Sequence, residues 1–196
     1  MKPQNSLTAR FSVVNLGTPG EQVALSPLGA VAVGYLLKPG YIRAPNGAKT
    51  RLPEGLLPYA MTSKGTIGGQ LSNRAVVFKA GNIDILFPDQ AVQRQTTVGA
   101  LTDSGLMLFG RSTESEGPVG WNWALVQGEK ELTDNPAALA EDGWYITRDT
   151  SAPERVWKRK RQKLIGLAGQ DWTNATHIAR GGLACGYTEY SGPGYV

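Results

Sequence analysis

The chain has 196 residues, of which 41% are apolar and 18% charged, and its formal net charge is +4. This composition is that of a globular chain with a hydrophobic core and excludes an intrinsically disordered one. The single cysteine, Cys185, excludes an intrachain disulfide framework, and with one histidine, His177, the chain is too poor in Cys and His ligands for the usual zinc sites.

Targeting signals are not apparent in the sequence. The N-terminus lacks the apolar run of a signal peptide, and no window approaches about 18 uninterrupted apolar residues. The sequence therefore predicts synthesis in the cytoplasm and no membrane partner.

Short apolar segments separated by turn signals run through the first three quarters of the chain. Strands are expected at residues 8–16, 29–37, 41–44, 48–52, 74–79, 83–87, 95–101, 106–109, 119–126 and 143–148. The dipeptide Asn46-Gly47 is a strong hairpin signal between two of them. Turns about every ten residues predict a mainly β fold, an antiparallel sandwich or barrel. We find no internal repeat.

Helix signals are short and come late in the chain. We expect helices at residues 137–141 and 173–180, and a basic one at residues 153–165 after a capping-box pattern from Ser151 to Glu154. The predicted organisation is a β-rich core domain over residues 1–150 and a basic helix within residues 151–168. Residues 169–196 then form a C-terminal extension that packs on the core or on a neighbouring subunit, ending in an extended arm.

The charges are segregated along the sequence. Residues 154–163 contain six Lys or Arg and one acid, a local charge of +5, whereas residues 112–154 contain nine acids and two bases, a net of −7. Opposite charges on one chain favour head-to-tail contacts between copies.

The basic segment has three interpretations, which the sequence leaves open. It is a solvated helix face, a surface that docks on an acidic protein, such as residues 112–154 of a neighbour, or a contact to nucleic-acid phosphates. In the docking interpretation the predicted assembly contacts are Arg155, Lys158, Arg159, Lys160, Arg161 and Lys163, with the tail tyrosines Tyr187, Tyr190 and Tyr195. In the nucleic-acid interpretation the contacts are Lys158, Arg159, Lys160 and Arg161, with Trp157 stacking on a base.

Residues that would carry catalysis or hold a cofactor are not recognisable. No nucleophile elbow, Walker motif or Gly-x-Gly-x-x-Gly is present, and we interpret His177 and Cys185 as structural. We therefore assign no catalytic, cofactor-binding or metal-binding residue. Paired acids such as Glu141 and Asp142 lie in polar turns. A hydrolase with a dispersed acidic site stays an alternative, which a deep pocket collecting acids from remote strands would support.

In general character the chain resembles structural subunits of large assemblies, above all capsid, neck and tail proteins of tailed bacteriophages. The shared character consists of long Gly- and Pro-rich loops, segregated charge, an aromatic C-terminal tail and no catalytic set. The resemblance implies a non-enzymatic structural protein located in a virion. Its partners would be further copies or other structural subunits, and nucleic-acid binding through residues 155–163 is the alternative.

Overall fold

The computed structural model describes residues 20–88, 95–112, 121–128, 130–134, 136–147, 155–158, 161–164, 174–178 and 180–187. The strand expected at residues 8–16, the basic residues Arg159 and Lys160, and Tyr190 and Tyr195 with the C-terminal arm lie outside the described residues.

Within the described residues, the strands form five antiparallel sheets, each made of strands that are consecutive in the chain. Sheet one contains β1 (Gln22–Leu25), β2 (Val31–Gly34), β3 (Pro39–Arg43) and β4 (Lys49–Glu54). Sheet two contains β5 (Leu57–Met61), β6 (Ile67–Leu71), β7 (Arg74–Lys79) and β8 (Asn82–Ile85). Sheet three contains β9 (Thr96–Leu101), β10 (Leu106–Ser112), β11 (Trp121–Gln127) and β12 (Lys130–Asp134).

Sheets four and five complete the described part of the chain. Sheet four contains β13 (Pro136–Leu139), β14 (Tyr145–Thr147), β15 (Arg155–Lys158) and β16 (Arg161–Leu164). Sheet five contains β17 (Asn174–Ile178) and β18 (Ala184–Tyr187), joined through the short 3₁₀ element η2 (Arg180–Gly182). Sheet four thus has strands on both sides of residue 150, where the sequence placed a domain boundary.

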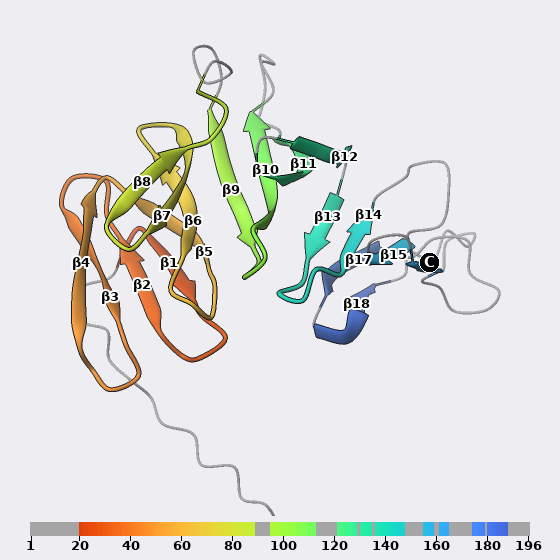
Figure 1. Ribbon diagram of the computed structural model, residues 1–196, viewed down its shortest axis with the longest axis horizontal. Coiled ribbons are helices and arrows are strands. Elements are labelled where there is room, and N and C mark those ends of the chain that lie inside the picture. The colour runs from red at the N-terminus through yellow and green to blue at the C-terminus, as the bar shows by residue number, and fades with distance from the viewer. Residues whose placement is uncertain are drawn as a thin grey trace, which may run out of the picture.

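The sheets follow one another in chain order, with sheet one at the left of Figure 1 and sheet five at the right. The first strand of each sheet contacts the first two strands of the preceding one: β5 contacts β1 and β2, β9 contacts β5 and β6, β13 contacts β9 and β10, and β17 contacts β13 and β14. Successive four-stranded sheets packed in this way are arranged like the blades of a β-propeller. The predicted mainly β, antiparallel fold is confirmed, and no described sheet closes into a barrel.

An equivalent turn joins the first and second strands of every sheet, so the chain contains an internal repeat that was not predicted. The last glycine of each turn adopts a positive φ of 82°, 78°, 81°, 87° and 79° at Gly29, Gly65, Gly105, Gly143 and Gly182. The turn of sheet five differs in detail, because Gly181, which precedes its last glycine, also has a positive φ of 82°. The paired residues flanking the turn keep one register: Ala24 with Ala32, Ala60 with Gly68, Ala100 with Leu108, Ala138 with Ile146 and His177 with Cys185. The glycines are 36, 40, 38 and 39 residues apart, and this variable spacing hides a repeat that shares few residues.

A hydroxyl side chain closes this turn in the first three sheets. The backbone N–H groups of Ala30, Thr66 and Leu106 donate to the hydroxyl oxygens of Ser26, Thr62 and Thr102 at 2.9, 3.1 and 3.0 Å. In sheet four Ala140 takes the hydroxyl's place, yet its backbone N–H still donates to Trp144 O at 2.7 Å. The left-handed backbone conformation at the last position of the turn is unfavourable for any residue that has a side chain. The glycine therefore determines this turn more than the hydroxyl does.

Apolar side chains fill the spaces between neighbouring sheets. Between sheets one and two the buried cluster is Ala24, Ala32, Leu52, Leu56, Met61, Ile67, Val76 and Phe78. Between sheets two and three it is Ala75, Leu86, Val98, Leu101, Met107, Phe109, Ala124 and Val126. Sheets two and three approach so closely that a Cβ on Gly68 would lie 2.5 Å from Val98 Cγ1. Between sheets four and five only Ile146 is buried among the described residues of the cluster.

The predicted hairpins are confirmed, but the three predicted helices are wrong where the structure describes them. Strands β13, β15, β16 and β17 lie where helices were expected at residues 137–141, 153–165 and 173–180. The helix signals were local caps, whereas the chain forms cross-strand pairs such as Val156 with Lys163 and Ala138 with Ile146. Packing of each sheet on its neighbour outweighs such weak local preferences.

Candidate functional site

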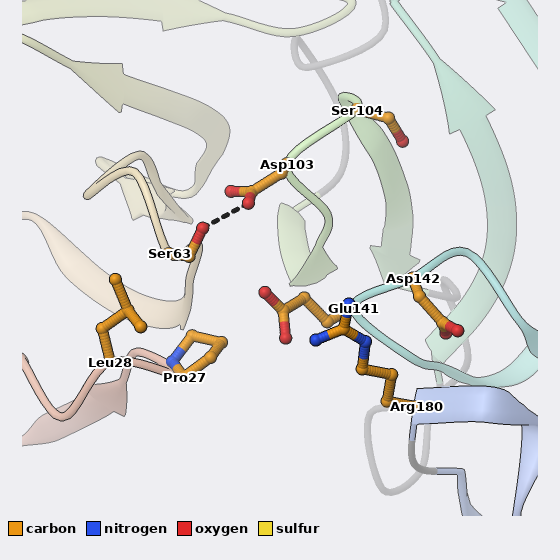
Figure 2. Close-up of a pocket in the computed structure, with 8 residues that line it drawn as sticks. All are labelled: Pro27, Leu28, Ser63, Asp103, Ser104, Glu141, Asp142 and Arg180. Atoms are coloured by element: carbon orange, nitrogen blue, oxygen red, sulfur yellow. Dashed lines mark hydrogen bonds between the residues drawn. The ribbon is translucent and has the colours of Figure 1, made fainter.

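A cavity of about 540 Å³ lies where the first turns of all five sheets meet. Its lining residues are Pro27, Leu28, Ser63, Asp103, Ser104, Glu141, Asp142 and Arg180. Figure 2 shows them arranged around one space, with Pro27 and Leu28 on one side and Arg180 on the other. Since each sheet contributes its first turn, the repeat itself builds the cavity.

Two positions of the repeated turn supply all the lining side chains. The first position of each turn holds Pro27, Ser63, Asp103, Glu141 and Arg180 in sheets one to five, and the second holds Leu28, Ser104 and Asp142 in sheets one, three and four. These two positions lie between the hydroxyl or alanine that starts the turn and the glycine that ends it. The backbone of the turn is therefore similar in sheets one to four and differs at Gly181 in sheet five, while the side chains at these two positions differ from sheet to sheet.

Asp103 links the turns of sheets two and three. The Ser63 hydroxyl donates a hydrogen bond to Asp103 Oδ2. This bond is the largest influence on the carboxyl and, with the nearby Lys64, holds the pKa of Asp103 below its usual value despite partial burial. Asp103 is therefore ionised near neutral pH and serves as a fixed acceptor between two turns.

Asp142 links the turns of sheets four and five in a similar way. Its Oδ2 accepts from the Gly181 backbone N–H at 2.9 Å and from Lys158 Nζ at 3.3 Å. Burial would raise the pKa of Asp142, but these two donors outweigh burial and hold the pKa below its usual value. Lys158 Nζ also lies 5.6 Å from the centre of the Trp144 ring. The turn of sheet five is thus tied to sheet four by a charge-assisted contact.

Glu141 adds a third acidic group to the cavity, beside Asp103 and Asp142, and Arg180 supplies its basic group. Figure 2 shows the Glu141 carboxylate and the Arg180 guanidinium both reaching into the space between the turns. Such a pair suits a polar ligand or peptide segment carrying both a donor-rich and an acceptor-rich group. Among the described residues no group of three or more His, Cys, Asp or Glu side chains is placed to hold a metal ion.

Of the predicted assembly contacts, only Lys158 has a described side chain, and that side chain is bonded within the chain to Asp142. Arg155 and Trp157 lie on β15, Arg161 and Lys163 on β16, and Tyr187 on β18. The register brings Lys158 opposite Arg161 in one hairpin. His177 and Cys185 are paired positions on β17 and β18.

The sequence analysis did not single out Ser63, Asp103, Ser104 or Arg180. A signal for most of them exists in the segments Ser26-Pro-Leu-Gly29, Thr62-Ser-Lys-Gly65, Thr102-Asp-Ser-Gly105 and Ala140-Glu-Asp-Gly143. Aligning these segments would have shown that the two residues between the first residue, Ser, Thr or Ala, and the final glycine are equivalent. It would thus have placed them together at one end of the molecule.

No protein-family model matches this chain, and no curated protein sequence is significantly similar to it. No helix in the described part of the chain is both long enough and apolar enough to cross a membrane.

Proposed function

We propose that this protein is a non-enzymatic structural subunit of a large assembly, of the viral kind found in tailed bacteriophages, and that it contacts neighbouring subunits through loops of sheet one. The observation that carries the proposal is the pair Leu36 and Leu37, which lies between β2 and β3 and is 55% and 88% exposed. Adjacent exposed leucines are typical of a surface that another protein covers.

This loop, residues 35–38, is held in place although its leucines are exposed. The Leu36 backbone N–H donates to Glu21 Oε2 at 3.1 Å, and the Gly55 N–H donates to Tyr35 O at 3.2 Å. Lys38 Nζ lies 4.1 Å from the centre of the Tyr35 ring. A backbone fixed by three contacts presents its apolar side chains in one arrangement, which lowers the entropy lost on binding.

The cavity carboxylates favour a structural role over hydrolysis. A glycosidase-like pair needs a carboxyl with a raised pKa that can donate a proton. Asp103 and Asp142 have lowered pKa values instead, and both are bonded to a neighbouring turn. The cavity does collect acids from two sheets, as the hydrolase alternative requires, but two of its three acids are used to hold turns together.

The proposal is tested by the native mass of the chain over a range of concentrations, measured by sedimentation velocity. We expect oligomers for the wild type and mainly monomers for a variant with Leu36→Ser and Leu37→Ser. Leu132→Ser is the matched control, because Leu132 on β12 is 46% exposed and lies in another sheet. A wild type that stays monomeric at high concentration would contradict self-assembly through this loop.

The second candidate is nucleic-acid binding by the β15–β16 hairpin, which the pairing of two basic strands favours. Replacing Arg159, Lys160 and Arg161 with Gln tests it without touching Lys158, which is bonded to Asp142. Strong wild-type binding to random DNA that weakens with salt and is lost in this variant would favour nucleic-acid binding over the structural role.

A further inference from the structure

Sheet one exposes an apolar residue at a position that is buried in sheets two and three and half-buried in sheet four. Leu25, the residue before the turn of sheet one, is 68% exposed. Its equivalents in sheets two and three, Met61 and Leu101, are 6% and 9% exposed because the preceding sheet covers them. In chain order no sheet precedes sheet one among the described residues, so Leu25 has no such cover.

Sheet five exposes an apolar residue on the opposite side of the same gap. Leu183 follows the turn glycine of sheet five and is 75% exposed. Its equivalents in sheets three and four, Leu106 and Trp144, pack on the turn glycine of the next sheet, whereas nothing lies within 4 Å of the Cβ positions of Gly65 and Gly105. The Leu106 Cδ2 atom lies 3.9 Å from the Cβ position of Gly143, and the Trp144 ring lies 2.9 Å from that of Gly182. For Leu183, the next turn around the cavity is that of sheet one.

The two exposed sides already border one cavity. Leu28 of sheet one and Arg180 of sheet five both line it, and Figure 2 shows them on either side of the same opening. We propose that sheet five packs against sheet one of the same chain, placing Leu183 on the Gly29 turn and covering Leu25, so that the five sheets close into a ring around the cavity.

Sheet five of the same chain is the partner of this face, because its contact with sheet one would repeat the contacts that neighbouring sheets already make. The four existing sheet-to-sheet contacts use the same elements, a first strand on the first two strands of its neighbour. The contact of β1 with β17 and β18 would be the fifth of the kind. A second copy could offer the same elements, but Arg180 of the same chain, in η2 between β17 and β18, already lines the shared cavity. Closure would also complete the cavity wall between Leu28 and Arg180.

Charged substitutions at the two leucines test the closure in the full chain. We expect Leu25→Lys and Leu183→Lys each to lower the melting temperature by several degrees, and the double variant to lower it by less than the sum, because the second change affects a contact that is already open. Leu132→Lys is the control, since Leu132 is 46% exposed and lies on β12 of sheet three, outside both this contact and the loop of residues 35–38. Equal melting temperatures for Leu25→Lys and Leu132→Lys would overturn the proposal.

A cross-linking experiment then identifies the chain that supplies sheet five. Leu28→Cys and Arg180→Cys are introduced together with Cys185→Ser, which removes the native thiol. An equal mixture of ¹⁴N- and ¹⁵N-labelled protein is then treated with a short bis-maleimide. We expect cross-linked peptides of residues 28 and 180 with a single isotope label, as closure within one chain requires. Leu132→Cys with Arg180→Cys is the control and should cross-link poorly. Mixed-label peptides would show a second copy at this face and overturn closure within the chain.

Discussion

Sheets two and three are held together differently from sheets four and five. Between the former lies a cluster of buried apolar side chains centred on Phe109, which is fully buried. Between the latter Ile146 is the buried member of the described cluster, and the polar contacts of Asp142 with Gly181 and Lys158 join the sheets. Sheets with equivalent turns and the same strand register can thus be joined to their neighbours in two ways, by a buried apolar cluster or by polar contacts. This difference predicts that the contact between sheets four and five, which lacks a large apolar cluster among the described residues, should respond more strongly to charge and pH.

Phe109→Ala tests most directly the apolar contact between sheets two and three, and it should have the largest effect. Phe109 packs against Phe87 with ring centres 4.7 Å apart, and the Arg111 guanidinium lies 5.0 Å from its ring. Removing a fully buried phenylalanine costs about 3–5 kcal/mol, so we expect a loss of this size in the free energy of unfolding, measured with urea. Phe109→Leu is the control and should lose less than half as much. A loss below about 1 kcal/mol would mean that the site collapses and the cluster is not tightly packed.

Acid should lower the stability of the two regions to different extents, which is the next largest effect that we expect. The pKa values of Asp103 and Asp142 are lower in the folded chain than when unfolded. Each carboxylate therefore contributes stability that is fully present above about pH 4, the ordinary aspartate range, and is lost as pH falls through the folded pKa. Asp103 joins sheets two and three, which the apolar cluster around Phe109 still holds together after the carboxylate is protonated. As pH falls below about 4, we therefore expect protection against hydrogen exchange to be lost in sheets four and five before it is lost around Phe109. Simultaneous loss of protection in both regions would contradict this difference.

Asp142→Asn isolates the polar contact at neutral pH. The change removes the charge that Lys158 meets, and the Asp142 side chain is 20% exposed, so we expect a loss of about 1–2 kcal/mol after allowance for solvent screening. The loss should appear as faster exchange of the β17 and β18 amides. Glu141→Gln is the matched control, because Glu141 occupies the same turn and reaches into the cavity, and it should leave exchange unchanged.

The smallest expected effect concerns the hydroxyl that sheet four lacks. Thr102→Val removes the acceptor for the Leu106 N–H and should cost about 1 kcal/mol. Ala140→Ser is the reciprocal change, and because the Asp142 carboxylate already accepts from the Trp144 backbone N–H, we expect it to alter the stability of the chain by less than about 0.5 kcal/mol. Both are measured by thermal unfolding. If Ala140→Ser destabilises the chain by more than about 0.5 kcal/mol, the turn of sheet four is not equivalent in detail to those of Ser26, Thr62 and Thr102.

Much of the strand pattern could be predicted from the sequence, because turns and alternation are local. The hairpin at Asn46-Gly47 and the pairing of β7 with β8 follow from residues only a few positions apart. A helix was wrongly predicted for the basic segment because a helix-capping pattern precedes it. Its pairing as β15 and β16 depends on β14 alongside, which the local sequence does not encode.

The candidate site could not be predicted in the same way. By itself the sequence determined the β class, the poverty in Cys and His, and the separation of acidic from basic segments. The tertiary structure alone decided that Ser63, Asp103, Glu141 and Arg180, which lie about 40 residues apart in sequence, share one cavity. The physical reason is that each sheet must bury its face on the next, and this stacking brings equivalent turns together at one end of the molecule.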